Sequence, residues 1–124
     1  MIAQLQEDSL ALLTQLISIQ SFSKEESGTA NVIADFLQQR GVETHRKLNN
    51  IWAYNQHFDA SKPTILLNSH HDTVKPNPGY TRDPYAPTVE EGRLYGLGSN
   101  DAGGCLVSLI ATFLYYYKQE DLAY

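Results

Sequence analysis

The sequence has very little cysteine and no long hydrophobic segment. Its one cysteine, Cys105, cannot form an internal disulfide, which fits a reducing compartment, and we therefore expect a cytoplasmic location. The longest apolar stretch, residues 105–117, is interrupted by Ser108 and Thr112 and is shorter than the ~20 residues of a membrane-spanning helix. The N-terminus has no positively charged segment followed by an apolar core, so no signal peptide is evident.

Clusters of positive charge are also missing. No group of five or more basic residues occurs, and the formal net charge is −5. We therefore expect neither a nucleic acid nor an anionic membrane as the partner. A hydrophobic content of 42%, with eight Tyr and four Phe, instead indicates a chain that folds. At 124 residues it is at most one small domain, and we find no internal repeat, low-complexity tract or linker.

Hydrophobic periodicity and turn residues predict an α/β or α+β protein with a mixed sheet flanked by helices. Ser23 and Glu26 fit a capping box at the start of the second helix, and Gly41 is a candidate for its C-terminal cap. The four prolines between positions 75 and 87 indicate a long surface loop. The predicted elements are helices at 8–19, 24–40 and 103–118, strands at 42–47, 51–54 and 64–69, and a hairpin at 88–95 that turns at Glu91 and Gly92.

The first candidate functional stretch is residues 66–74, in which an apolar run ends in His70, His71 and Asp72. Alternation along an extended segment places His70 and Asp72 on the same side. Asp72 can then accept a hydrogen bond from the ring nitrogen of His70 that does not bind metal, which fixes the tautomer of a ligand. His71 points the other way, and we expect it to be polar or packed and not a ligand. The alternative is that this stretch is a solvent-facing polar turn after a strand.

The second candidate stretch is residues 94–104, in which glycines surround Asp101 just before an apolar helix. Together with His70, Asp101 would supply imidazole nitrogen and carboxylate oxygen, which suit a divalent metal. Asp is also a preferred helix N-cap, so a purely structural role is the alternative. A phosphate-binding loop is conceivable, but the spacing is not G-x-G-x-x-G and no Lys-Ser/Thr pair follows.

Three other features are expected to be structural. Cys105 opens an apolar helix face, and a buried free cysteine is the preferred interpretation over a nucleophile. Residues 115–117 are three consecutive tyrosines on a helix, which point in different directions and should divide between core and rim. His45 and His57 lack carboxylate or glycine neighbours, and we expect both at the surface.

The two stretches together resemble a known family. His70-x-Asp72-x-Val74 followed by Gly96-x-Gly98-x-x-Asp101-x-x-Gly104 is similar to the M20 zinc amidohydrolases, and the resemblance extends to the linkers at residues 83–85 and 91–96. The family includes acetylornithine deacetylases, succinyl-diaminopimelate desuccinylases and carboxypeptidase G-type enzymes. The acetylornithine deacetylase branch, which acts in arginine biosynthesis, looks most similar.

The resemblance implies a zinc-peptidase-like catalytic domain that hydrolyses an N-acyl amino acid. It implies two zinc ions, with cobalt as a possible substitute. It gives His70 and Asp101 as metal ligands, with Asp101 bridging the ions, and Asp72 as a catalytic residue behind His70. It also implies a homo-oligomer and a cis peptide bond after Asp101. The sequence departs from the family at Gly103, where many members have Lys, and at Ser69, where glycine is common.

The family's general base and remaining ligands lie further along the chain than Asp101. Only Glu120 and Asp121 follow here, without the Glu-Glu context of the family. We therefore expect residues 1–124 to be the N-terminal portion of one catalytic domain, without the rest of that domain or the dimerisation domain, and to be inactive alone. A succinyl-diaminopimelate or small-peptide substrate remains an alternative. So do a metal-binding or interaction fragment without activity, and a structural domain that uses Asp72 and Asp101 as caps.

Overall fold

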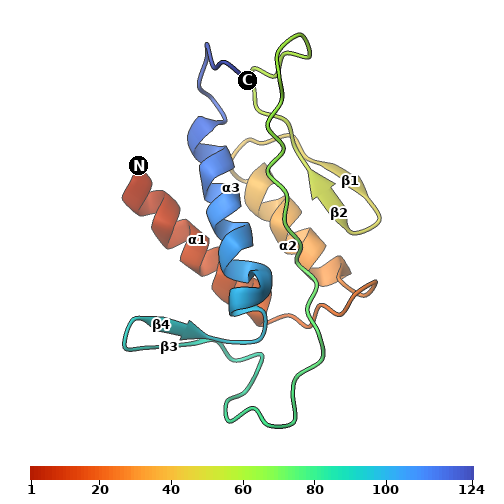
Figure 1. Cartoon of the computed structure of the whole chain (residues 1–124), viewed down its shortest axis with the longest axis vertical. Coiled ribbons are helices and arrows are strands. Elements are labelled where there is room, and N and C mark those ends of the chain that lie inside the picture. The colour runs from red at the N-terminus through yellow and green to blue at the C-terminus, as the bar shows by residue number, and fades with distance from the viewer.

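The computed structural model describes residues 1–124 as three helices and two small β-hairpins (Figure 1). This combination of helices with small antiparallel sheets is the α/β class that the sequence predicts. The elements in chain order are helices α1 (Ile2–Ile17) and α2 (Ser27–Gln38), strands β1 (His45–Lys47), β2 (Asn50–Trp52), β3 (Thr88–Glu90) and β4 (Arg93–Tyr95), the π-helical turn η1 (Ser99–Gly103), and helix α3 (Gly104–Tyr116).

The hydrophobic core lies between the three helices, and the apolar stripe of α1 packs directly on α3. Burial of these side chains is what holds the helices together, since each loses most of its contact with water. Helix α1 begins at Ile2 and not near residue 8, because its polar first turns continue the same helix. The buried core residues are Leu12, Leu13, Leu16, Ile17, Ile33, Leu37, Val42, Leu106, Val107, Ile110 and Tyr117.

The capping box predicted before α2 does not form. The helix begins at Ser27 with Glu26 as its N-cap, and no side chain caps it. Ser23 instead lies in a tight turn, in which Glu25 N donates to Phe22 O at 2.8 Å and Lys24 has a φ of 73°. The other end of α2 is as predicted: Gly41 has a φ of 76°, the left-handed conformation that glycine adopts without strain.

The strands form two separate two-stranded antiparallel sheets and not one mixed sheet. Strand β1 pairs with β2, with His45 opposite Trp52, and β3 pairs with β4. The second hairpin turns at Glu91 and Gly92 as predicted, with φ values of 49° and 75°. Positive φ at both central residues is the backbone of a type I′ turn, whose twist matches that of the paired strands.

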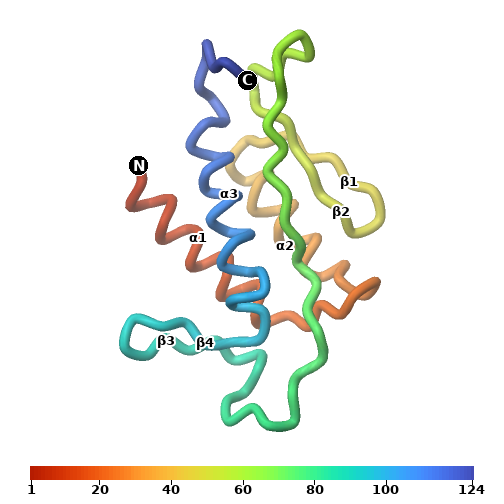
Figure 2. The backbone as a smooth tube through the Cα atoms, viewed as in Figure 1, coloured from red at the N-terminus to blue at the C-terminus, as the bar shows by residue number.

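The strand predicted at residues 64–69 is wrong. The segment is extended and runs beside the helices (Figure 2), but the backbone of residues 63–72 makes no hydrogen bond to other backbone. Its apolar side chains are not buried, since Ile65 is 58% and Leu66 81% exposed. The physical reason is the absence of a neighbouring strand, because a strand exists only where another backbone pairs with it.

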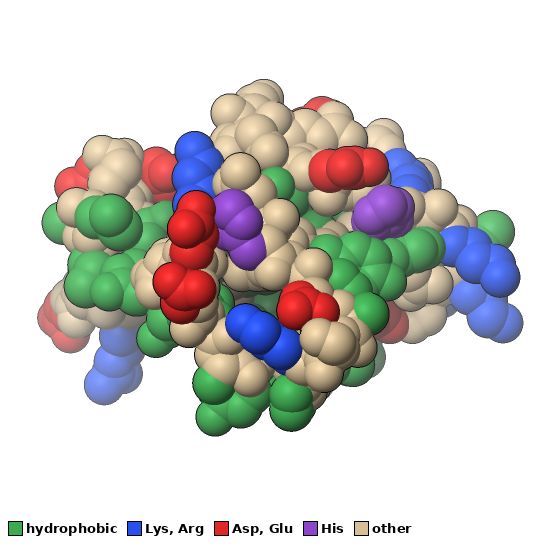
Figure 3. Space-filling view, turned by 90° about the horizontal axis from the view of Figure 1, so that it is seen from above, with side chains coloured by type: hydrophobic (Ala, Val, Ile, Leu, Met, Phe, Trp, Pro, Cys, Tyr) green, Lys and Arg blue, Asp and Glu red, His purple; other side chains and the backbone are tan.

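The last helix follows the prediction closely, with Leu106 and Ile110 in the core and Tyr117 buried while Tyr115 and Tyr116 are exposed. The expectation for Cys105 is wrong, because this residue is exposed. It lies with Ser108 and Thr112 on the face of α3 that points away from the core. None of the helices combines the length and the hydrophobicity that a membrane span requires. Hydrophobic side chains nevertheless reach the surface between charged ones, as the view from above shows (Figure 3).

Candidate functional site

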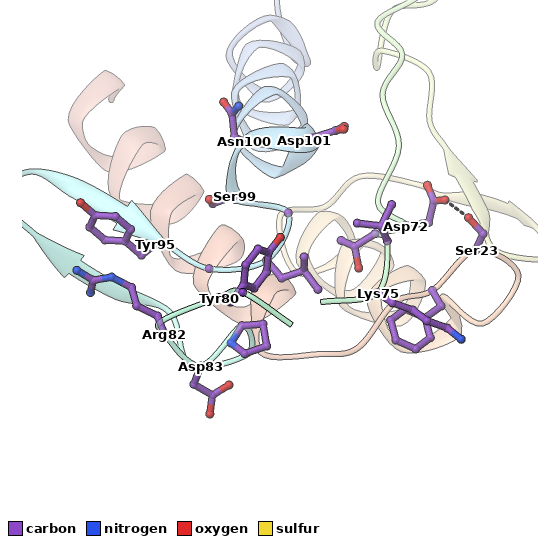
Figure 4. Close-up of a pocket in the computed structure, with 18 of the residues that line it drawn as sticks. Ser23, Asp72, Lys75, Tyr80, Arg82, Asp83, Tyr95, Ser99, Asn100 and Asp101 are labelled. Atoms are coloured by element: carbon purple, nitrogen blue, oxygen red, sulfur yellow. Dashed lines mark hydrogen bonds between the residues drawn. The ribbon is translucent and has the colours of Figure 1, made fainter. Parts of the chain in front are cut away.

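The two candidate stretches meet at an open cleft of about 1000 Å³ (Figure 4). Its walls are formed by the turn before α2, by residues 70–75 with the proline-containing loop that follows them, and by the link from β4 into η1. In Figure 4, Ser23 and Asp72 lie at one end of the cleft, and Arg82 and Tyr95 lie at the other. The lining residues are Phe22, Ser23, His70, Asp72–Lys75, Gly79–Pro84 and Tyr95–Asp101.

The structure brings together all three of the predicted site residues. His70 Nδ1 lies 3.1 Å from Asp72 Oδ1, and His70 Nε2 lies 3.2 Å from Asp101 Oδ1. The imidazole therefore stands between two carboxylates, one at each ring nitrogen. The side chains of His70 and Asp101 are 52% and 88% exposed, whereas that of Asp72 is 34% exposed. Asp72 thus lies behind His70, while Asp101 faces the open cleft.

Backbone contacts hold the His70–Asp72 segment against the connection between α1 and α2. Thr73 N donates to Ser21 O at 2.8 Å, and Phe22 and Thr73 form an isolated parallel bridge. This pairing fixes where the residues just before Thr73 are placed. It is also the only backbone pairing that this extended segment makes.

Close packing at two glycines, Gly98 and Gly103, holds Asp101 in place on the other side of His70. Gly98 has a φ of 79° and closely approaches Thr73, so that a Cβ on Gly98 would lie 2.6 Å from Thr73 Cγ2. Gly103 N donates to Gly98 O at 2.8 Å and closes the loop that carries Asp101. The peptide bond between Asp101 and Ala102 is cis, as the resemblance implies.

Asp101 does not cap α3. Its backbone has a φ of −121° and a ψ of 92°, inside the irregular turn η1, and no side chain caps either η1 or α3. The structural alternative for Asp101 is therefore not supported, because its carboxylate faces His70 and solvent instead of the first amides of the helix. Gly103 stands where many family members have Lys. A Cβ there would lie 2.6 Å from both Gly98 O and Leu13 Cδ1, so this chain has no room for a side chain at that position.

Ser23 is the site residue that sequence reasoning missed. Its hydroxyl donates to Asp72 Oδ2, the oxygen that His70 does not use (Figure 4). This hydrogen bond, with the neighbouring His70, holds the pKa of Asp72 below its usual value, although partial burial acts in the opposite direction. The local sequence assigned Ser23 to a helix cap, and nothing in it indicates a partner near residue 72.

His71 lies outside the site, as expected. Its Nε2 is 2.9 Å from Asn49 O and its Nδ1 is 2.7 Å from Thr29 Oγ1. A carbonyl oxygen can only accept, so His71 Nε2 carries a proton and donates it to Asn49 O, while Nδ1 is engaged by the Thr29 hydroxyl. Both ring nitrogens of His71 are therefore engaged, and neither is free to bind a metal. The contact with Thr29 attaches residues 70–72 to α2. His57 is exposed, as predicted, and His45 is half-buried against Trp52.

The other end of the cleft is built around Arg82, which sequence reasoning also missed. Two of its guanidinium nitrogens donate to the two carboxylate oxygens of Glu90 at 2.8 and 2.7 Å, and the group stacks over Tyr95 with 3.9 Å to the ring centroid. These contacts raise the pKa of Arg82 and lower that of Glu90, the hydrogen bond between them being the main cause. They tie the proline-containing loop to the β3–β4 hairpin and so shape the cleft.

The geometry of His70 and Asp101 fits one metal ion. Two ligand atoms each about 2.0–2.2 Å from a tetrahedral zinc are about 3.3–3.6 Å apart, and the observed 3.2 Å between His70 Nε2 and Asp101 Oδ1 lies just below this range. The donor set of imidazole and carboxylate suits zinc or cobalt. The chain contributes only these two donors, because no group of three or more His, Cys, Asp or Glu side chains could hold a metal.

Comparison with known proteins places both candidate stretches within a known family. Residues 66–121 match the pattern that defines peptidase family M20/M25/M40. Succinyl-diaminopimelate desuccinylases are similar over most of the chain. That of Delftia acidovorans is 32% identical over 103 residues, which are 75% of this chain and 27% of the relative. The enzymes of Methylibium petroleiphilum and Blochmanniella floridana are 30% and 34% identical, over 90% of this chain and 32% and 31% of their own length.

The fold and the site define an α/β protein with a His–Asp cluster at the wall of an open cleft. The chain belongs to the M20 amidohydrolases, peptidase family M20/M25/M40. It spans about a third of the length of the curated relatives it matches. These relatives are desuccinylases, so they do not support the acetylornithine deacetylase branch that the sequence motifs favoured.

Proposed function

We propose that the protein is a metal-dependent hydrolase that removes an acyl group from an N-acyl amino acid, and that residues 1–124 are the N-terminal portion of its catalytic domain. The rest of the catalytic domain, the general base and a dimerisation domain would lie in sequence outside these residues. A cytoplasmic homo-oligomer is the accompanying expectation. Membership of the M20 family supports the reaction class.

The observation that carries the proposal is the placement of His70 between Asp72 and Asp101. A histidine that donates Nδ1–H to one carboxylate keeps the lone pair of Nε2 for a metal on the other side. Asp101 lies on that side, with a carboxylate that offers two oxygens. His70 and Asp101 would therefore hold the metal, and Asp72 would act through His70.

Each residue then has a defined task. Asp72 keeps the proton on His70 Nδ1 and raises the basicity of Nε2. Asp101 supplies negative charge that offsets the positive charge of the bound cation. Bound zinc or cobalt would supply Lewis acidity, polarising the acyl carbonyl and lowering the pKa of water. The cleft beside these residues is open and lined by polar and aromatic groups, which leaves room for an N-acyl amino acid.

We infer that an N-succinylated amino acid is the first substrate to test. The relatives named above are succinyl-diaminopimelate desuccinylases, and succinyl-diaminopimelate is among the substrates considered from the sequence. An N-acetylated amino acid such as acetylornithine is the second. The cleft contains two cationic side chains, Lys75 and Arg82, and Arg82 is already paired with Glu90.

The test is turnover of N-succinyl and N-acetyl amino acids by the full-length gene product supplied with zinc or cobalt. We expect hydrolysis that a chelator abolishes, and an Asp72→Asn variant with turnover lowered by about 10- to 100-fold or more. Hydrolysis that survives both chelation and this substitution would contradict the proposal. A variant with His57→Ala, an exposed histidine remote from the cleft, is the matched control and should keep its activity.

The isolated 124-residue chain gives a second, separate test. Two protein donors cannot complete a tetrahedral site without water or further ligands, so we expect weak zinc binding and negligible amide hydrolysis. Chelator-sensitive turnover by these residues alone would show that the missing ligands and base are not needed. Weak binding without turnover is also what a metal-binding fragment would show, and the full-length measurement separates the two.

A further inference from the structure

Ser23 is joined to the candidate catalytic residue by a hydrogen bond that no motif assigns. Its hydroxyl donates to Asp72 Oδ2, while Asp72 Oδ1 faces His70 Nδ1 at 3.1 Å. Each oxygen of the Asp72 carboxylate therefore has one protein partner. A carboxylate held at only one oxygen can rotate about its terminal bond, whereas one held at both has its plane fixed.

The backbone around Ser23 is held in place independently of this hydrogen bond. Glu25 N donates to Phe22 O at 2.8 Å, which closes a tight turn with Ser23 at its second position. On the other side of the contact, Thr73 N donates to Ser21 O at 2.8 Å. Ser21 is only 2% exposed, so this attachment is part of the protein interior. The Ser23 hydroxyl is therefore presented to Asp72 by a fixed frame.

The consequence concerns which nitrogen of His70 carries the proton. Two carboxylates face the ring, Asp72 at Nδ1 and Asp101 at Nε2 with 3.2 Å to Oδ1. A neutral imidazole has a single N–H and can donate it to only one of them. A proton on Nε2 would occupy the lone pair that a metal needs. The site is competent only if the proton stays on Nδ1.

We propose that Ser23 is a positioning residue that fixes the Asp72 carboxylate so that His70 keeps its proton on Nδ1 and leaves Nε2 free for a metal. This inference rests on the proposed metal-binding role of His70. Removal of a partner that contacts the ligand directly typically costs about 10- to 100-fold in metal affinity, and Ser23 lies one hydrogen bond further back, so its removal should cost less. Ser23 acts through Asp72 and His70 and does not itself contact the metal or the substrate.

The experiment measures the His70 tautomer directly. In the metal-free 124-residue chain at about pH 9, where an ordinary imidazole is neutral, long-range ¹H–¹⁵N NMR distinguishes Nδ1–H from Nε2–H. We expect Nδ1–H in the wild type and a shift towards Nε2–H in Ser23→Ala. In parallel, cobalt affinity, followed by visible absorption, should fall by up to about 10-fold in Ser23→Ala, the lower end of what loss of a direct partner of the ligand costs.

Two sets of controls separate this role from a general effect on folding. Ser23→Thr and Ser23→Val have the same shape but differ in the hydroxyl, so Thr should restore the Nδ1–H tautomer and Val should not. Ser61→Ala removes another exposed Ser–Asp hydrogen bond, that of Ser61 Oγ to Asp59 Oδ1 at 2.7 Å, and should change neither readout.

The outcomes distinguish the inference from the proposed function. If Ser23→Ala and Ser23→Val keep both the wild-type tautomer and the wild-type cobalt affinity, Ser23 is not a positioning residue. If the wild type binds no cobalt, either alone or as full-length protein, the proposed function fails, but the tautomer comparison still tests what Ser23 does to Asp72. Should Ser23→Ala fail to fold, the Thr and Val pair decides the question.

Discussion

His70 Nε2 lies 3.2 Å from Asp101 Oδ1, although the two residues belong to separate motifs on different elements. One follows an extended segment with no strand partner, and the other sits in an irregular turn before α3. They meet because Thr73 is paired to the connection between α1 and α2, and Gly98 packs against Thr73. The two candidate ligands, His70 and Asp101, are therefore brought together by contacts of neighbouring residues in the chain.

Removal of either candidate ligand should reduce metal binding by the chain. We expect His70→Ala or Asp101→Ala to lower cobalt affinity by more than the about 10- to 100-fold that a supporting residue costs, because a donor atom itself is lost. Isothermal titration with cobalt or zinc measures the change. His57→Ala is the matched control, since His57 lies far from the cleft and near Glu120. An equal loss in this control would show that binding occurs elsewhere.

A side chain at position 103 should destabilise the protein. A Cβ on Gly103 would lie 2.6 Å from Gly98 O and from Leu13 Cδ1, so Gly103→Ala forces the core of α1 or the Asp101 loop to move. Overpacking of this kind costs about 1–3 kcal/mol in the free energy of unfolding, measurable by urea denaturation.

Gly92→Asn provides the comparison for this prediction. Gly92 also has an unusual backbone, with a φ of 75°, but a Cβ there meets nothing within 4 Å, and Asn tolerates this conformation. We expect a smaller loss of stability than for Gly103→Ala. The opposite order would mean that the structure around Gly103 accommodates a side chain freely.

The contact between α1 and the end of α2 should make stability depend on pH in the acid range. Hydrogen bonds from Arg40, at 2.7 Å, and from Gln4 hold the pKa of Asp8 below its ordinary value of 3.8. Because the folded-state pKa is the lower one, this stabilisation is present above the unfolded-state pKa and is lost as pH falls through the folded value. For a partly exposed pair we expect at most about 1 kcal/mol.

The measurement is the melting temperature of wild type and Asp8→Asn against pH. The wild type should be more stable near pH 6, and the difference should shrink as the pH drops below about 4. Asp59→Asn is a control for an acidic residue with a lowered pKa but no contact between helices. A wild-type advantage that persists undiminished in strong acid would show that the Asp8 charge is not its source.

The isolated chain should self-associate through residues 64–69. Their backbone groups have no backbone partners, and Leu66 is 81% exposed, so the segment offers both an open edge and apolar surface. We expect light scattering to show a mass that rises with concentration, and Leu66→Lys to suppress the rise. Val89→Lys changes another exposed aliphatic residue, 67% exposed, and should have less effect. A wild-type monomer over a wide concentration range would contradict this prediction.

The sequence by itself determined several local elements and singled out His70, Asp72 and Asp101, which the structure brings together. Periodic apolar residues placed α3 and the core stripe of α1, and Glu91-Gly92 placed the hairpin turn, because these signals depend only on neighbours in the chain. The spacing of His70 and Asp72 also placed one side chain behind the other. The two motifs indicated the family, and the family comparison agrees.

Only the tertiary structure decided features that depend on distant partners. Residues 64–69 have the composition of a buried strand, yet they form none because no backbone lies beside them to pair with. Ser23 has the local pattern of a helix cap, yet its hydroxyl goes to Asp72, because the Phe22–Thr73 bridge brings that carboxylate within reach. Cys105 is exposed because the packing of α3 on α1, and not the hydrophobicity of α3, selects which face is buried. A single sequence specifies local preference, but the three-dimensional arrangement determines which partner satisfies each polar group.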